Sequence, residues 1–183
     1  MPVPNAPAAR RLQLIVMGVA GSGKTTIANR LSERLGCEVA DADDFHPPAN
    51  IAKMSAGVPL QDEDRWPWLE AIAAWIRAHD AAGRTAVVTC SALKKAYRRV
   101  LLGASPRAVF VHLTATPALL AERIGARKGH FFSPAMLASQ LAILEPLGPD
   151  EPGIAVDVTP SPDEIADGVL RALELAPAGG PRP

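Results

Sequence analysis

The chain has 183 residues, 48% of them hydrophobic, which is enough to bury the core of one globular domain. Its 19 basic and 19 acidic residues balance, and this argues against nucleic acid or an acidic membrane surface as a partner. No apolar run approaches the ~18 residues of a membrane span. Cys37 and Cys90 lack the spacing of a metal or redox motif, so we expect a reduced, cytoplasmic protein.

In chain order, apolar β-rich runs alternate with amphipathic helical stretches. Strands are predicted at 12–18, 37–40, 86–90, 108–113 and 154–158. Helices are predicted at 26–36, around Trp68, Ile72, Trp75 and Ile76, and near 116–124, 134–145 and 162–175. This alternation predicts an α/β fold, a mostly parallel sheet covered by helices. We expect one domain at 12–176, between a flexible N-terminal segment (1–11) and a flexible tail (177–183).

Residues 18–25 read GVAGSGKT and match the phosphate-binding pattern G-x-x-x-x-G-K-[ST], between a predicted strand and a predicted helix. Glycines let the backbone curl so that amides and the helix N-terminus face the phosphates of a nucleotide. Lys24 is expected to bridge the β- and γ-phosphates of ATP, and Thr25 to bind Mg²⁺. The predicted nucleotide-binding residues of this P-loop are Gly18, Val19, Ala20, Gly21, Ser22, Gly23, Lys24, Thr25 and Thr26.

An acidic stretch, DADDFHPPAN, begins where the second predicted strand ends. Asp41 is placed to hold Mg²⁺ through water. Asp43 projects the same way if the backbone stays extended, and could accept the proton of an attacking hydroxyl. The alternative is that the acids cap a helix beginning after Pro47, a reading that suits Asp44 better than Asp43. A GTPase switch is disfavoured because the guanine-specifying N-K-x-D is absent.

A basic, glycine-punctuated stretch, ERIGARKGHFF, lies between two predicted helices. Phosphoryl transfer needs positive charge that closes over the phosphates and excludes water. We therefore predict a mobile lid at about 123–134, with Arg127 as a catalytic cation and Arg123 on the nucleotide. A solvated basic turn is the alternative.

Three sets of residues together resemble the gluconokinases, P-loop kinases that phosphorylate D-gluconate on its 6-hydroxyl. The first set runs from Asp41-x-Asp43-x-x-His46-Pro47-x-x-Asn50-x-x-Lys53-Met54 to Asp62-x-Asp64-Arg65-x-Pro67-Trp68. The others are Cys90-Ser91-Ala92-Leu93-Lys94-Lys95-x-Tyr97-Arg98, and Arg123-x-x-x-Arg127-x-x-His130-Phe131 with Ser139-Gln140 and Leu144-Glu145-Pro146. Ala42 departs from the pattern, where glycine is expected, and so does Leu141, where an aromatic is usual.

This resemblance implies a three-layer P-loop fold like that of the nucleoside-monophosphate kinases, with five parallel strands and a lid. It also implies D-gluconate as substrate and, commonly, a homodimer. The carboxylate of gluconate favours arginine over lysine, so Arg65 and Arg98 are the candidates, with Arg65 modestly preferred. The remaining substrate-binding candidates are His46, Asn50, Lys53, Ser91, Lys94 and, in the lid, His130. Another small-metabolite kinase, such as a shikimate kinase, and an inactive nucleotide-binding protein remain as alternatives.

Overall fold

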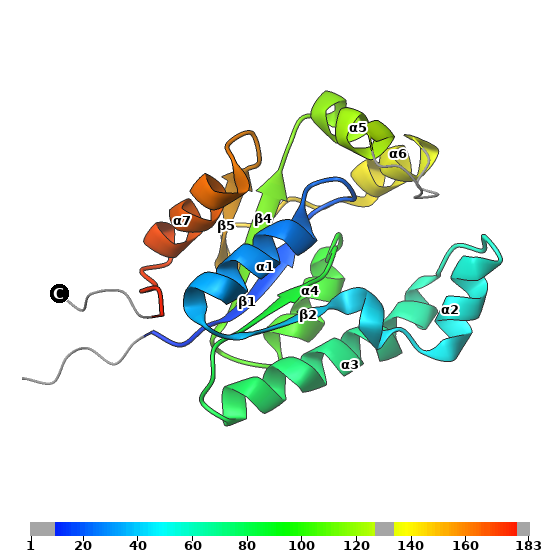
Figure 1. The fold of residues 1–183 in the computed structure, drawn as a ribbon. Helices are drawn as coiled ribbons and strands as arrows, with labels where there is room; N and C mark the ends of the chain where they lie inside the picture. The colour runs from blue at the N-terminus through cyan, green and yellow to red at the C-terminus, as the bar shows by residue number, and fades with distance from the viewer. Residues whose placement is uncertain (1–9, 127–133, 179–183) are drawn as a thin grey trace, which may run out of the picture.

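A five-stranded parallel sheet with the order β2-β3-β1-β4-β5 forms the centre of the computed structural model, which describes residues 10–126 and 134–178 (Figure 1). Its strands are β1 (Gln13–Met17), β2 (Glu38–Asp41), β3 (Ala86–Thr89), β4 (Ala108–Thr114) and β5 (Gly153–Asp157). The five predicted strands are therefore confirmed, with ends shifted by at most one residue. Strand β1 is buried along its whole length, as expected for a central strand with helices on both faces.

Seven α-helices and one short 3₁₀ helix connect the strands within the described residues. They are α1 (Lys24–Leu35), η1 (Ala42–Phe45), α2 (Pro48–Ser55), α3 (Asp62–Ala81), α4 (Lys95–Leu102), α5 (Pro117–Ala126), α6 (Pro134–Ile143) and α7 (Pro162–Ala172). Among these residues, no helix combines the length and the apolar character that a membrane crossing requires.

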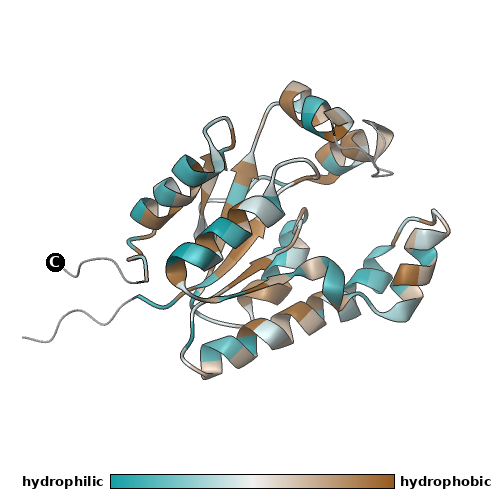
Figure 2. Cartoon of the chain, in the orientation of Figure 1, coloured by the Kyte–Doolittle hydropathy of each residue, from teal (hydrophilic) through white to brown (hydrophobic). Residues whose placement is uncertain are grey.

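The helices cover the sheet in two outer layers, because alternate strand residues point to opposite faces. Leu14 and Val16 pack into a core cluster with α1 and α7. Ile15 and Met17 pack into a second cluster with α3 and α4. Figure 2 shows the same arrangement, with apolar strands inside and polar surfaces on the outer sides of the helices. The predicted three-layer architecture is confirmed.

The P-loop and the acidic stretch identified in the sequence both follow the carboxyl ends of strands. Strand β1 lies between β3 and β4, so the chain reverses its direction of strand addition there, and such a point forms a ligand crevice in α/β sheets. The P-loop follows β1, and η1 follows β2. Helices α5 and α6 pack on this end through a small cluster of Val19, Leu93, Leu120 and Leu137.

Ala42 fits its position without strain. It lies in η1, is buried in the second core cluster, and is not among the positive-φ residues. The glycine expected there is therefore not required by the backbone. Segment 1–9, most of the predicted lid (127–133) and the end of the predicted tail (179–183) lie outside the described residues.

Candidate active site

The P-loop presents an uncapped helix N-terminus to the cleft. Gly23 stands at the N-cap of α1 with φ of 90°, no side chain caps the helix, and an added Cβ would meet nothing within 4 Å. The first amides of α1 are thus available to an anion. Gly18 has a different reason to lack a side chain, since a Cβ there would lie 2.8 Å from Ser22 Oγ and 2.9 Å from the Leu113 carbonyl oxygen.

Two side chains hold the loop in shape. Lys24 Nζ donates to the Val19 carbonyl at 3.1 Å, near the start of the loop. The Ala20 amide donates to Oε1 of Gln140 on α6 at 2.8 Å. Gln140 belongs to one of the family blocks, but its local sequence gives no sign of this contact, because its partner is 120 positions away.

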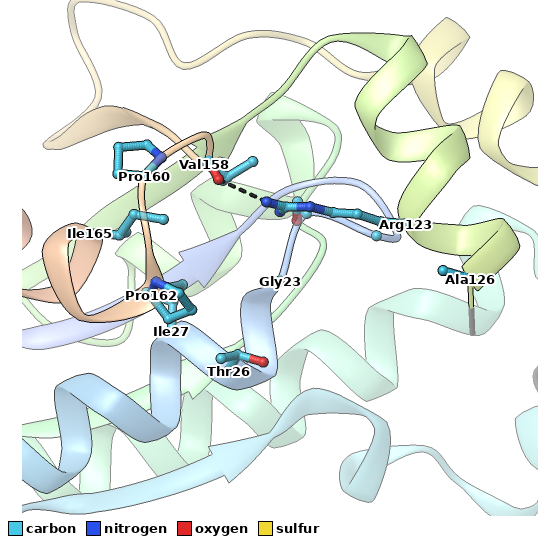
Figure 3. Close-up of a pocket in the computed structure, with 11 residues that line it drawn as sticks. Gly23, Thr26, Ile27, Arg123, Ala126, Val158, Pro160, Pro162 and Ile165 are labelled. Carbon is cyan, nitrogen blue, oxygen red and sulfur yellow. Dashed lines mark hydrogen bonds between the residues drawn. The ribbon is translucent and has the colours of Figure 1, made fainter. Parts of the chain in front are cut away.

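A pocket of about 310 Å³ extends from the P-loop toward α7 (Figure 3). Its phosphate end is lined by Gly21, Ser22, Gly23 and Thr26, and its far end by Val158, Pro160, Pro162 and Ile165. Arg123 reaches across from α5 and donates to the Val158 carbonyl at 2.9 Å. The shape and apolar far end suit a nucleoside, and Arg123, which the sequence analysis assigned to the nucleotide, lines this pocket.

The acidic stretch meets the P-loop at the tip of β2. Thr25 Oγ1 donates to Asp41 Oδ2 at 3.3 Å, and Asp41 Oδ1 accepts the Asp43 amide at 3.0 Å. Asp41 therefore caps η1. Helix α2 begins at Pro48 with Pro47 as its N-cap, so the alternative that Asp43 or Asp44 caps this helix is wrong.

Asp43 is exposed and lies two residues after Asp41, in η1 and not in the extended backbone that its predicted orientation assumed. The protein around it removes part of its hydration, which raises its pKa, and the negative charge of Asp41 raises it further. His46 and Lys24 act in the opposite direction. A carboxylate with a raised pKa is a better proton acceptor than an ordinary aspartate, provided that it is ionised.

His46 is held in place by Trp68 and Asn50. Its ring stacks on Trp68 at 4.6 Å, and the Trp68 indole donates to the Ala42 carbonyl at 2.6 Å. Asn50 directs its amide nitrogen to His46 Nδ1 at 3.3 Å and to the Asp64 carbonyl at 2.8 Å, so Nδ1 accepts and Nε2 carries the hydrogen. Burial lowers the pKa of His46, which Asp43 opposes. Asn50 is buried, and both contacts of its amide nitrogen are to the protein itself.

The start of α3 gathers the cations predicted to bind substrate. Lys53 Nζ pairs with Asp64 at 2.6 Å, and Lys94 Nζ pairs with Asp62 at 3.1 Å. Between them, Arg65 donates to the Leu60 carbonyl at 3.3 Å but, among the described residues, pairs with no carboxylate. Its Nε atom is buried and has no hydrogen-bond partner in that part of the chain.

Arg98 does not face the cleft, which corrects the expectation that it might bind substrate. Its side chain is 0% exposed and forms an ion pair with Glu151 at 2.6 Å. It also donates to the carbonyls of Ala92 at 2.9 Å and Glu145 at 3.0 Å. Ala92 has φ of 46°, so Arg98 holds a strained turn that carries Ser91 and Lys94 toward the site.

The remaining predictions are only partly covered by the structure. Ser91 lies in the turn after β3, where its carbonyl accepts the Gly18 amide at 3.4 Å. Arg127 and His130 lie outside the described residues. Tyr97 and Asp62 were given no role from sequence, yet the Tyr97 hydroxyl donates to Asp62 beside Lys94.

Comparisons with known proteins agree with these features. A family model described as an AAA domain matches residues 14–130. The chain is 48% identical over 161 residues to the gluconokinase of Gluconobacter oxydans, covering 88% of this chain and 90% of that protein. A gluconokinase from Sinorhizobium meliloti superposes with a TM-score of 0.82 at 39% identity, covering 91% of this chain and 94% of that chain.

Two further structures show the difference between close sequence similarity and a likeness of fold alone. An unliganded sugar kinase from Janibacter sp. HTCC2649 superposes with a TM-score of 0.85 at 46% identity, covering 94% of this chain and 99% of that chain. A shikimate kinase from Acinetobacter baumannii shares 17% identity with a TM-score of 0.54, covering 90% of this chain and 93% of that chain, which is a likeness of fold alone. The chain belongs to the gluconokinase family.

Proposed function

We propose that this protein transfers the γ-phosphoryl group of ATP to the 6-hydroxyl of D-gluconate, giving 6-phospho-D-gluconate and ADP. The observation that carries the proposal is the meeting of two loops at one edge of the sheet: Thr25 of the phosphate cradle contacts Asp41 across 3.3 Å, with Asp43 beside it. A proton acceptor thus stands next to the place where the terminal phosphate of ATP would lie.

The donor atoms at this point suit Mg²⁺. They are one hydroxyl oxygen from Thr25 and one carboxylate oxygen from Asp41, both hard ligands. Magnesium favours such oxygens and takes its remaining ligands from water and substrate phosphates. When bound, it would neutralise charge on the phosphate oxygens. The chain's own part is to hold the two oxygens together and, through Lys24 and the amides of α1, to fix the triphosphate.

The chemical step is a direct in-line transfer. Asp43 accepts the proton of the 6-hydroxyl as that oxygen forms a bond to the γ-phosphorus. The bond from this phosphorus to the β–γ bridging oxygen breaks, and its electron pair leaves on ADP. His46, with hydrogen on Nε2, can donate to the hydroxyl oxygen or to Asp43 and so orient the acceptor. Arg127 and Arg123 are proposed to neutralise the migrating phosphoryl group.

The carboxylate end of gluconate is assigned to Arg65. Lys53 and Lys94 already form ion pairs with aspartates on the same helix start, whereas Arg65 feels the charges of Asp62 and Asp64 but forms no ion pair with a carboxylate among the described residues. Its planar guanidinium suits two parallel hydrogen bonds to a carboxylate. Lys53, Lys94, Ser91 and, in the lid, His130 are left for the hydroxyl groups, with the lysines able to exchange an aspartate oxygen for a substrate oxygen.

A coupled ADP-release assay over a panel of acceptors tests the proposal. The panel contains D-gluconate, related sugar acids, shikimate and nucleoside monophosphates. We expect ADP release to depend on gluconate, and Lys24→Ala to weaken both nucleotide binding and turnover. Release with a different acceptor would support another small-metabolite kinase on this scaffold. If a folded protein that binds ATP releases no ADP with any acceptor of the panel, this would support an inactive nucleotide-binding protein.

The family resemblance also leads us to propose a homodimer that works in the cytoplasm. Light scattering coupled to gel filtration measures the first directly, and a monomer at micromolar concentration would refute it.

A further inference from the structure

The Tyr97 ring lies close to two of the cations that were predicted to bind substrate. The Arg65 guanidinium carbon lies 5.5 Å from the centre of the Tyr97 ring, and Lys94 Nζ lies 5.4 Å from it. Both distances are within the range of a cation–π interaction. The ring is only 2% exposed, so its position is fixed by packing and not by solvent.

The Tyr97 hydroxyl extends this arrangement to an acid. It donates to Asp62 Oδ1, and Lys94 Nζ donates to both Asp62 oxygens at 3.1 Å. Asp62 opens α3 and Lys94 immediately precedes α4, so one buried tyrosine joins the starts of two helices. On the outer side, the Trp66 ring packs edge-on against Tyr97 at 5.6 Å.

This geometry is more than core packing requires. An aliphatic side chain would fill much of the same space, whereas the tyrosine ring contacts Arg65 and Lys94 with its face, and its hydroxyl contacts Asp62. Long cationic side chains lose considerable rotamer entropy when a ligand fixes them. A ring that already restrains both cations lowers this cost before the substrate arrives.

We infer that Tyr97 is a positioning residue that sets recognition of the substrate carboxylate, by restraining Arg65 and Lys94 as a preorganised anion-binding pair. The inference rests on the proposed function, because it takes the acceptor to be a sugar acid. It assigns to Tyr97 an effect on the affinity for the acid and none on the affinity for ATP.

The test compares Tyr97→Met, which removes the ring, with Tyr97→Phe, which keeps it. In Tyr97→Met the KM for gluconate should rise about threefold to thirtyfold, the range of a lost cation–π contact, with the KM for ATP unchanged. Tyr97→Phe should recover most of this loss. Raising the salt concentration should increase the gluconate KM less steeply in Tyr97→Met than in the wild type, because the cations are less well placed.

Phe110→Leu is the matched control, since Phe110 is a fully buried aromatic in the same core cluster. It should lower the melting temperature without changing the ratio of the two KM values. If Tyr97→Met moves that ratio no more than Phe110→Leu does, Tyr97 only packs and the inference is wrong.

A double-mutant cycle with Arg65→Lys tests whether Tyr97 acts through Arg65. The effect of the Tyr97 change on the gluconate KM should largely disappear in the Arg65→Lys background, and additive effects would overturn the inference. If Tyr97→Met does not fold, Tyr97→Leu takes its place in the cycle, because it also removes the ring that contacts Arg65. Failure of the proposed function is recognised separately, because the wild-type enzyme would then release no ADP with gluconate.

Discussion

Thr25 and Asp41 join the P-loop to the tip of β2 through a hydrogen bond of 3.3 Å. Thr25 follows β1 and Asp41 ends β2, two strands that β3 separates in the sheet, and each residue supplies one hard oxygen. If Asp41 holds Mg²⁺ through water, Asp41→Asn should raise the Mg²⁺ concentration for half-maximal activity about tenfold to a hundredfold, as for other outer ligands. Titration of activity with Mg²⁺ at fixed ATP measures this.

Asp44→Asn is the control for that titration, because Asp44 is a neighbouring exposed carboxylate in η1 without this contact. An equal shift in both variants would mean that only the general negative charge of the stretch matters, and Asp41 would lose its assigned role.

Removing the proton acceptor should stop turnover while sparing nucleotide binding. Asp43→Asn is expected to lower kcat by about a hundredfold or more, the range for loss of a general base. Because the pKa of Asp43 is raised above its ordinary value of 3.8, the acid side of the wild-type kcat/KM profile should fall at a pH above that value. Fixed-time ADP-release assays across pH measure turnover, and direct titration with an ATP analogue measures nucleotide binding. Normal turnover by the variant would exclude Asp43 as the base.

The same substitution should make the fold more stable at neutral pH. Loss of hydration and the nearby Asp41 raise the pKa of Asp43 in the folded state, so the folded protein binds this proton more tightly than the unfolded chain does. The wild type is therefore stabilised by this group below pH 3.8, and this contribution is lost as the pH rises through the folded-state pKa. Asp43→Asn cannot ionise, so its advantage in melting temperature over the wild type should grow with pH across that window.

A melting series at several pH values gives the comparison, with Asp44→Asn again as the control. A variant that melts below the wild type at pH 8 would show that Asp43 makes stabilising contacts as an anion, contrary to this account.

The sheet could be predicted from sequence because its signal is local. Each strand is a short apolar run bounded by polar or glycine residues, and each long helix has an apolar face. These local patterns were sufficient to predict the strands and the three layers. The P-loop was equally local, because its pattern fixes the loop between a strand and a helix. The prediction for Asp43 assumed extended backbone after the strand, and this is wrong, because Ala42–Phe45 forms the 3₁₀ helix η1.

Contacts that depend on tertiary packing could not be predicted in this way. Arg98 has the sequence context of a substrate ligand, but its side chain is turned into the core by Glu151, which is 53 positions later. Gln140 and Ala20 are 120 positions apart. Nothing in either local sequence indicates which partner will be adjacent after folding.

Arg98 and Glu151 form a buried pair, so breaking it should cost stability and not substrate binding alone. Both side chains are almost inaccessible, at 0% and 3% exposed. Removing one partner leaves the other charge uncompensated, which typically costs about 3–5 kcal/mol. Arg98→Met should therefore lower the free energy of unfolding by roughly that amount. The double variant Arg98→Met with Glu151→Leu should recover part of the loss in a denaturant titration, and no recovery would mean that the carbonyl contacts dominate.

Substitution of Gln140 should change the KM for ATP and not that for gluconate, because its contact with the site in the described part of the chain is the amide of Ala20 in the P-loop. Gln140→Leu removes the acceptor from that amide and frees the loop from α6. Loss of this hydrogen bond in Gln140→Leu should raise the KM for ATP about twofold to tenfold, the net value of one such bond, and leave the KM for gluconate unchanged. Ser139→Ala is the control, since Ser139 is an exposed neighbour on the same helix. Should Gln140→Leu keep the wild-type KM for ATP, the loop would hold its phosphate-binding shape without α6, and the contact would be incidental to nucleotide binding.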